Sequence, residues 1–212
     1  RAGALSCAKH FPGHGGTRTD SHMALPRVED PAEAVRSRDL VPFRAAVDAG
    51  ADLVMTAHVL FGALDPARTA TFSPEILEGI LRRETGFAGA CISDSLRMDA
   101  SRECGTPGGN EVSALAAGCD LLLDPEDPEA ATAAVEAALR EGRLDPARVR
   151  EASARVDRLV SAAAPPFLPE GAGILRLPAA ADEVARAAVT RLGGPAAPLR
   201  PGSARVAVVD DD

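Results

Sequence analysis

The segment 9–22 carries the densest set of reactive side chains in the sequence, and it reads Lys-His-Phe-Pro-Gly-His-Gly-Gly-Thr-Arg-Thr-Asp-Ser-His. It holds three of the four histidines. In extended backbone Asp20 and His22 point the same way, because alternate side chains share a face. A carboxylate that bonds one imidazole nitrogen leaves the other nitrogen to act as a general acid or base. The pair indicates proton-transfer chemistry, with an accidental surface pair as the alternative.

Two further residues have types and positions that suit chemistry. Lys9 is the only lysine in a chain whose other basic residues are all arginine, which indicates a site that needs a compact ammonium group. Asp94 ends the run Ala-Cys-Ile-Ser-Asp, where a polar residue follows buried apolar ones. Asp94 is therefore either a reactive carboxylate at the end of a strand or the cap of a following helix.

A repeated strand and helix unit positions these residues. Short apolar runs predict strands over 4–8, 53–56, 90–93 and 119–123. Helices are predicted to open at Asp30-Pro31, Ser73-Pro74, Asp127-Pro128 and Asp145-Pro146, where a capping side chain precedes a proline. Gly50, Gly86 and Gly142 follow three of the helices, and Pro42 predicts a kink or a break in the first one. Segment 9–22, rich in proline and glycine, is then a loop that leaves the first strand.

The alternation of apolar strands with helices predicts an α/β protein with a parallel sheet covered on both faces. Four such units are half of an eightfold (β/α) barrel, which takes about 250 residues when complete. A doubly wound open sheet fits the same alternation, but the sequence has no glycine fingerprint for it. In a barrel the site belongs at the carboxyl ends of the strands, where the segment 9–22, His58 and Asp94 are all predicted to lie.

The reactive motifs together resemble a known family. The loop motif from Lys9, Met55-Thr-Ala-His58, the stretch 72–89 and Ile92-Ser-Asp-Ser-Leu-Arg-Met98 are similar to family 3 glycoside hydrolases of the β-N-acetylglucosaminidase type. The resemblance covers roughly residues 4–160. It implies the C-terminal half of a TIM barrel over 1–162, with the first half upstream of a chain cut at both ends. A linker over 163–180 and the truncated start of an α/β/α sandwich domain over 181–212, with a helix over 181–192 and a strand over 205–209, would follow.

The resemblance also implies roles for the site residues. Asp94 matches the nucleophile that forms a covalent glycosyl-enzyme, and His22 matches the acid/base, with Asp20 orienting it. Lys9 and His10 match the pair that hydrogen-bonds the sugar hydroxyls. We expect His58 to line the substrate site and His14 to stabilise the loop. Ser95 departs from the family, which often has a second Asp there, so a supporting contact should differ.

Composition narrows the class of protein and its partners. A net charge of −8 argues against a nucleic-acid partner, and no apolar run is long enough to span a bilayer. The four cysteines form neither a metal-binding nor a disulfide pattern, and Cys7, Cys91 and Cys119 fall in predicted strands as buried thiols. We expect no cofactor and no metal. The sequence sets no oligomeric state.

The resemblance implies a retaining hydrolase of β-linked N-acetylglucosaminides, from peptidoglycan turnover or chitin. A cytoplasmic location is expected, with secretion or cell-wall association left open. A β-glucosidase or a phosphorylase of the same family is the near alternative. A metal-binding protein using His10, His14, His22 and Asp20 is a different class, but Pro12 and Gly13 prevent the helix that His-x-x-x-His ligation needs. A non-catalytic fragment is the last alternative, and we expect this chain alone to be inactive.

Overall fold

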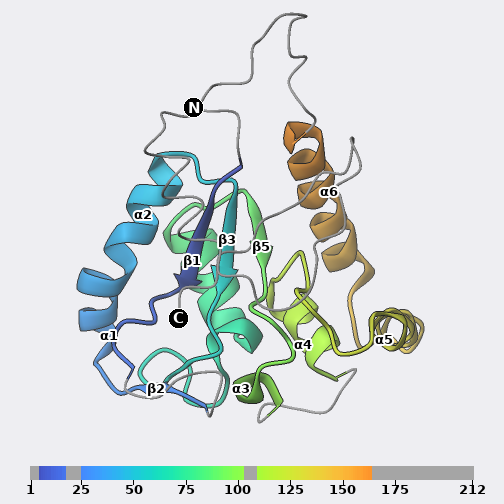
Figure 1. Cartoon of the computed structure of the whole chain (residues 1–212), viewed down its shortest axis with the longest axis horizontal. Helices are drawn as coiled ribbons and strands as arrows, with labels where there is room; N and C mark the ends of the chain where they lie inside the picture. Colours follow the sequence, from blue (N-terminus) through green and yellow to red (C-terminus); the bar gives the residue numbers. More distant parts are fainter. Residues whose placement is uncertain (1–4, 18–24, 103–108, 164–212) are drawn as a thin grey trace, which may run out of the picture. The chain divides into compact units, whose positions relative to one another are not determined.

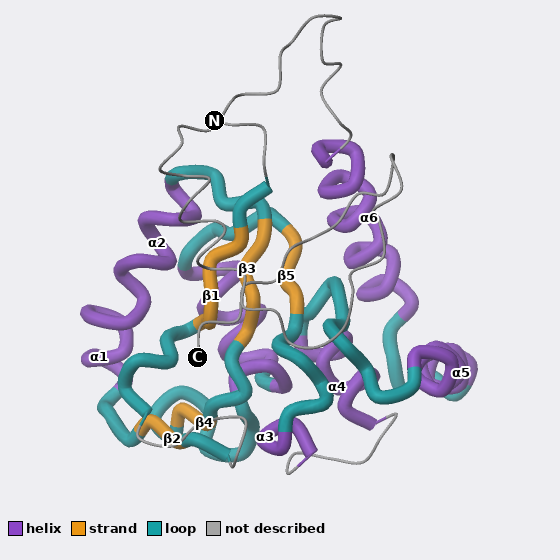
Figure 2. The backbone as a smooth tube through the Cα atoms, in the orientation of Figure 1, coloured by secondary structure: helices purple, strands orange, loops and turns teal. Residues whose placement is uncertain are grey.

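Parallel strands form the centre of the computed structural model, which describes residues 5–17, 25–102 and 109–163. One sheet has the order β1-β3-β5, with β1 over Cys7–Phe11, β3 over Leu53–Thr56 and β5 over Ala90–Ile92 (Figures 1 and 2). A second parallel pair joins β2 (Arg27–Val28) to β4 (Leu60–Phe61). All described residues belong to one compact unit, Arg1–Pro166. The predicted α/β class with parallel pairing is confirmed.

Helical segments alternate with these strands along the chain. They are α1 (Ala32–Ala34), the π-helical η1 (Val35–Asp39), α2 (Leu40–Asp48), the 3-10 turn η2 (Ala70–Phe72), the π-helical η3 (Glu75–Glu84), α3 (Asp99–Arg102), α4 (Gly109–Ala117), α5 (Pro128–Arg140) and α6 (Pro146–Ala163). Helix α2 lies beside β1 and α6 beside β5 (Figure 1). Among the described helices, none combines the length and apolar character that crossing a membrane requires.

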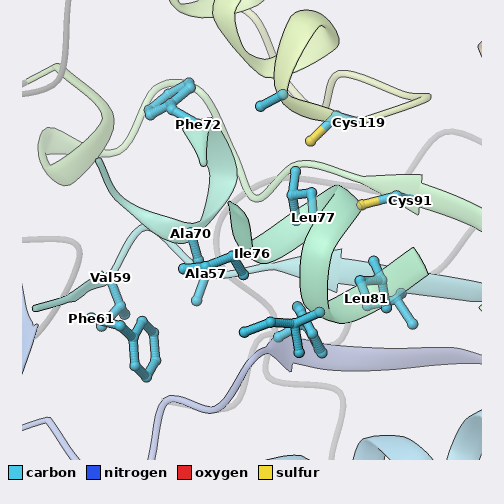
Figure 3. Packing of buried hydrophobic residues seen from close by; sticks show 14 of the residues in the cluster. Ala57, Val59, Phe61, Ala70, Phe72, Ile76, Leu77, Leu81, Cys91 and Cys119 are labelled. Carbon is cyan, nitrogen blue, oxygen red and sulfur yellow. The ribbon is translucent and has the colours of Figure 1, made fainter. Parts of the chain in front are cut away.

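The two faces of the sheet differ in burial. The register aligns Ala8, Val54 and Cys91 on one face, where Val54 and Cys91 are fully buried. Leu77 and Leu81 of η3 pack over this face beside Cys91 (Figure 3). On the other face Cys7 is exposed and Met55 is half-buried. The sheet was predicted to be buried on both faces, and only one face is fully buried. The prediction that Cys7 is buried is wrong, whereas Cys91 and Cys119 are buried as predicted.

The first strand lies further along the chain than predicted. β1 runs over Cys7–Phe11 instead of 4–8, so Lys9 and His10 belong to the strand and not to the loop. The cause is Phe11, which is fully buried and pairs with Thr56. Its carbonyl also accepts a hydrogen bond from Ala57 N at 2.9 Å. The apolar run predicted the strand too early in the sequence. Lys9 and His10 are polar, so they did not count as part of an apolar run, although alternate residues of this strand face away from the core.

The predicted strand over 119–123 is reduced to a single bridge between Ile92 and Leu121. Two backbone bonds form at this bridge, from Leu121 N to the Cys91 carbonyl oxygen at 3.1 Å and from Ser93 N to the Leu121 carbonyl oxygen at 3.0 Å. Beside them the Asp120 carboxylate accepts from Cys91 N at 2.9 Å, and Ser93 Oγ accepts from Leu123 N at 2.9 Å. The ladder is therefore short and is continued by side-chain contacts, which an apolar pattern does not reveal. Ser93, predicted as the last residue of its strand, lies one position past β5.

Three of the four predicted helix openings have the expected contact. Asp127 accepts from Glu129 N and Ala130 N at 3.0 Å and caps α5. Ser73 Oγ accepts from Ile76 N at 3.2 Å, and Asp145 accepts from Ala147 N at 2.8 Å. Asp30 makes no cap bond to α1, because its carboxylate accepts from Arg38 at 2.6 Å instead. The prediction for Asp30 is therefore wrong.

The predicted helix ends are also present, whereas the helical residues 32–48 run on without interruption at Pro42. Gly50, Gly86 and Gly142 have φ of 78°, 72° and 72°, the left-handed conformation that glycine adopts just past a helix. Pro42 lies in the first turn of α2, directly after the wide turns of η1, where its missing N–H costs no regular hydrogen bond. The predicted second domain, 181–212, and nearly all of the linker lie outside the described residues.

Candidate active site

The carboxyl ends of the three main strands bring several predicted site residues together. Lys9 and His10 come from the second half of β1, His58 follows β3, and Asp94 follows β5. Because the strands are parallel, these ends meet at one edge of the sheet. Asp20 and His22, the predicted acid/base pair, lie outside the described residues.

The Asp94 carboxylate lies near His10, one of the predicted sugar-binding residues. Asp94 Oδ2 is 3.8 Å from His10 Nε2, and the two side chains are 14% and 28% exposed. Asp94 Oδ1 accepts from Ser95 N at 2.8 Å, so one oxygen is fixed by the backbone and the other faces the imidazole. The following helix α3 begins only at Asp99, five residues later, so Asp94 does not cap it. A partly buried carboxylate with one oxygen held suits nucleophilic or electrostatic chemistry.

His58 is fully buried and has both ring nitrogens bonded within the protein. Nε2 lies 3.0 Å from the carbonyl oxygen of Ser95, and Nδ1 lies 2.9 Å from Thr71 Oγ1. The ring stacks on Phe72, with planes 17° apart and centroids separated by 5.8 Å. Burial lowers the pKa of His58, and this effect outweighs the opposing attraction of the Asp94 charge. His58 is therefore neutral near pH 7.

The loop after β1 is held by His14 and Gly13. Thr17 Oγ1 lies 3.1 Å from His14 Nδ1 and 3.0 Å from the His14 carbonyl oxygen, which closes a turn. Gly13 has φ of 145°, and a Cβ there would come within 2.8 Å of the Asp39 Cβ, so only glycine fits. The His10 and His14 rings meet edge to face at 6.1 Å. These contacts confirm the loop-stabilising role predicted for His14.

A cavity of 320 Å³ borders the same strand end. Its lining combines polar and charged side chains with the apolar Pro42 and Phe43, and the polar and charged members are Lys9, His10, His14, Arg38 and Asp39. The polar members suit hydroxyl-rich ligands. Within the described residues, no group of three or more His, Cys, Asp or Glu side chains is arranged to hold a metal ion.

Ser95, where the family often has Asp, contacts an acidic partner. Ser95 Oγ donates to Asp124 Oδ2 at 2.9 Å, and Arg97 Nε lies 3.7 Å from Asp124 Oδ1. The hydroxyl therefore ties the segment after β5 to the segment after the Leu121 bridge. This is the contact that Ser95 makes in this chain.

Two threonines at the site were missed by sequence reasoning. Thr56 is the last residue of β3 and Thr71 lies in η2, and both are fully buried. Their hydroxyls are 2.8 Å apart, and the Thr56 hydroxyl accepts from Asp94 N at 3.3 Å. The only signal was the position of Thr56 inside the Met-Thr-Ala-His motif. Thr71 had none, because its partners come from other segments.

Residues 1–159 match the family model described as the glycosyl hydrolase family 3 N terminal domain. The chain is 40% identical over 163 residues to a β-hexosaminidase from Methylococcus capsulatus, covering 74% of this chain and 48% of that protein. It is 43% identical over 137 residues to a β-hexosaminidase from Chromobacterium violaceum, covering 65% of this chain and 38% of that protein. The chain thus spans less than half of the length of these curated relatives.

A solved structure has the same fold as the chain. It is a glycoside hydrolase family 3 β-N-acetylglucosaminidase from Paenibacillus sp. str. FPU-7, with a TM-score of 0.74 and 36% identity. The similarity covers 95% of this chain and 34% of that structure. The fold of the chain is therefore one already known within a larger protein.

Proposed function

Because the chain belongs to the family of the glycosyl hydrolase family 3 N-terminal domain, which has a TIM-barrel-type α/β fold, we propose that it forms the C-terminal half of such a barrel. The full-length protein would be a retaining glycosidase that removes β-linked N-acetylglucosamine. Two observations support the half-barrel: three parallel strands in sequential order, and a sheet face that carries the exposed Cys7 and the half-buried Met55. The names of the similar proteins support the substrate class.

The single observation that carries the proposed chemistry is the approach of Asp94 to His10 at 3.8 Å. Asp94 acts as the nucleophile: its carboxylate attacks the anomeric carbon, and the bond from that carbon to the aglycone oxygen breaks. Lys9 and His10 hold the sugar hydroxyls beside this carboxylate. Because one Asp94 oxygen is bonded to Ser95 N, the other remains directed at the space in front of His10.

His22 and Asp20 complete the cycle as proposed acid/base. His22 gives its proton to the departing aglycone oxygen, and Asp20 stabilises the protonated imidazole. In the second half His22 takes a proton from water, the water oxygen attacks the anomeric carbon, and the bond to Asp94 breaks. The sugar leaves with its configuration retained, and both residues return to their starting protonation states.

Asp94→Asn in the full-length protein tests the nucleophile. Turnover of an aryl β-N-acetylglucosaminide should fall by roughly 10³-fold or more, while binding of a product analogue stays nearly unchanged. Asp99→Asn is the matched control, because it removes an exposed carboxylate only five residues away and should leave turnover unchanged. A fluorinated substrate that accumulates the glycosyl-enzyme should label the peptide containing Asp94 in mass spectrometry. Full activity in Asp94→Asn, or a label elsewhere, would remove Asp94 from this role.

His22→Ala tests the acid. Substrates with poor leaving groups should slow by about 10²–10⁴-fold, and activated aryl substrates far less, because only the former need protonation. The measurement is kcat/KM across a series of aryl leaving groups. Equal losses across the series would exclude His22 as the proton donor. Product analysis with and without inorganic phosphate separates the hydrolase from a phosphorylase, since the phosphorylase yields the sugar 1-phosphate.

A further inference from the structure

A continuous chain of hydrogen bonds connects the backbone N–H of Asp94 to the backbone carbonyl oxygen of Ser95. It starts at Asp94 N–H, which lies 3.3 Å from Thr56 Oγ1, and continues 2.8 Å to Thr71 Oγ1. From there it runs 2.9 Å to His58 Nδ1, and His58 Nε2 returns it over 3.0 Å to the Ser95 carbonyl oxygen. The three linking side chains are fully buried.

The partners of His58 set the direction of this chain. The Ser95 carbonyl can only accept, so His58 Nε2 carries a proton. Since burial keeps His58 neutral, Nδ1 accepts and Thr71 donates to it at 2.9 Å, with the Ala57 carbonyl oxygen as a second, longer acceptor at 3.2 Å. Thr71 then has no second proton, so Thr56 donates to Thr71 and accepts from Asp94 N. The direction runs from the Asp94 amide to the Ser95 carbonyl.

The circuit occupies a place where polar groups are costly. A buried hydroxyl or imidazole lowers stability unless it is hydrogen-bonded, and here each is. Phe72 stacks on the His58 ring and sets its plane. The circuit joins β3, η2 and the segment after β5, yet both of its ends contact the backbone of residues 94 and 95. The hydrogen bonds at both ends therefore hold the backbone of the proposed nucleophile, Asp94, and of the residue that follows it.

We propose that Thr56, Thr71 and His58 are positioning residues that hold the 94–95 backbone so that the Asp94 carboxylate is aligned for attack. This rests on the proposed function, in which Asp94 is the nucleophile. The Ser95 N–H that holds Asp94 Oδ1 belongs to the residue whose carbonyl receives the circuit, so a shift of that backbone moves the carboxylate. This role replaces the sugar contact expected for His58 from the sequence.

Thr71→Val in the full-length protein is the main test, because valine keeps the shape and removes the hydroxyl. The rate of glycosyl-enzyme formation should fall by about 10–100-fold, the effect of a small misplacement of a reacting group. The substrate Kd, obtained from the concentration dependence of the single-turnover rate, should change by less than about threefold, because no sugar contact is lost. Thr71→Ser retains the hydroxyl and should restore the rate to near the wild-type value. The measurement is single-turnover kinetics with an activated aryl substrate.

Ser73→Ala is the matched control. Ser73 lies two residues away and is fully buried, but its hydroxyl donates to Asp65 at 2.7 Å and accepts from Ile76 N. Its loss should lower the melting temperature and leave the glycosylation rate unchanged. If Thr71→Val and Ser73→Ala lower the rate alike, the circuit is merely structural and the proposal is wrong.

Thr56→Val is a second test of the positioning role, for use if Thr71→Val does not fold. It removes the Thr56 bonds to Asp94 N and to Thr71 Oγ1, and leaves Thr71 bonded to His58. The same rate loss, restored in Thr56→Ser, supports the proposal, and an unchanged rate overturns it. Asp94→Asn, run in parallel, separates the two hypotheses: if it is inactive while both valine variants react normally, the nucleophile stands and the positioning role fails.

Discussion

Two buried polar networks hold the segment 91–95 at its two ends, and they are built differently. At the start, the Asp120 carboxylate accepts from Cys91 N at 2.9 Å and Arg82 at 2.7 Å, and its other oxygen accepts from Arg148 and Arg155. At the end, neutral hydroxyls and an imidazole contact residues 94 and 95. The first network is ionic and the second is uncharged.

The difference separates two tasks. Arg82 comes from η3, and Arg148 and Arg155 come from α6, so the Asp120 network fastens two helices to one point beside the sheet. Charges are suited to that task, because their attraction is strong where water is excluded. Beside Asp94, a neutral network holds the backbone without adding a charge that would compete with a nucleophile. The ionic contacts of Asp120 thus hold η3 and α6 at the sheet, and the neutral contacts hold the backbone of Asp94.

Asp120→Ala should produce the largest loss of stability. The Asp120 side chain is fully buried, and its removal leaves three mostly buried arginines without their shared carboxylate. Breaking a buried ionic network in this way costs about 3–5 kcal/mol. Urea unfolding of the full-length protein measures the change in free energy. Glycosylation rates of the folded fraction should stay near wild type, in contrast with Thr71→Val.

Glu141→Ala is the control for Asp120→Ala. Its bond to Arg143 is also 2.7 Å long, but both side chains are more than half exposed. Exposed pairs contribute about 0–1 kcal/mol, so this variant should unfold nearly as wild type does. If Asp120→Ala lowered the free energy of unfolding as little as Glu141→Ala does, the Asp120 network would not be what fastens the two helices.

A smaller effect is expected from pH at the neutral network. Burial lowers the pKa of His58 below its ordinary value of 6.5, so the folded state binds this proton less well than the unfolded state. The contribution is complete above about pH 6.5 and is lost as the pH falls below that value. For one proton the slope is at most about 1.4 kcal/mol per pH unit, and it ends below the folded pKa. Urea unfolding at pH 7.5, 6.5 and 5.5 measures it.

His58→Gln isolates the contribution of this histidine from those of His10, His14 and the carboxylates. Glutamine keeps a donor and an acceptor but does not titrate in this range. The variant should lose less stability than the wild type between pH 6.5 and 5.5, whatever its stability at pH 7.5. Parallel losses in both proteins would show that His58 binds its proton equally well folded and unfolded.

The sequence predicted the parts of the fold that depend on local signals. β3 begins and ends at the predicted residues, and the glycines after the helices have the expected conformation. The predicted strand over 119–123 was too long, because backbone pairing is limited to one bridge at Leu121 and the side chains of Asp120 and Ser93 make the neighbouring contacts. Such contacts depend on which segments become neighbours, and no local pattern encodes them.

The candidate site divides in the same way. Lys9, His10 and Asp94 were identified because reactive residue types follow apolar runs, and the structure places all three at one sheet edge. The position of His58 was predicted, but its burial was not, since a histidine in a motif looks alike whether it faces substrate or core. Thr71 was missed altogether, because its importance comes from a neighbour 15 residues away, Thr56, and from His58.

The hydrogen bond from Ser95 to Asp124 has a consequence for substitutions at position 95. At 2.9 Å, a serine hydroxyl satisfies the Asp124 carboxylate, whereas an Asp at position 95 would place two like charges against each other. We expect an Asp there to be tolerated only with a change at position 124, or with a cation between the two carboxylates. Two positions separated by 29 residues are thus coupled through one contact.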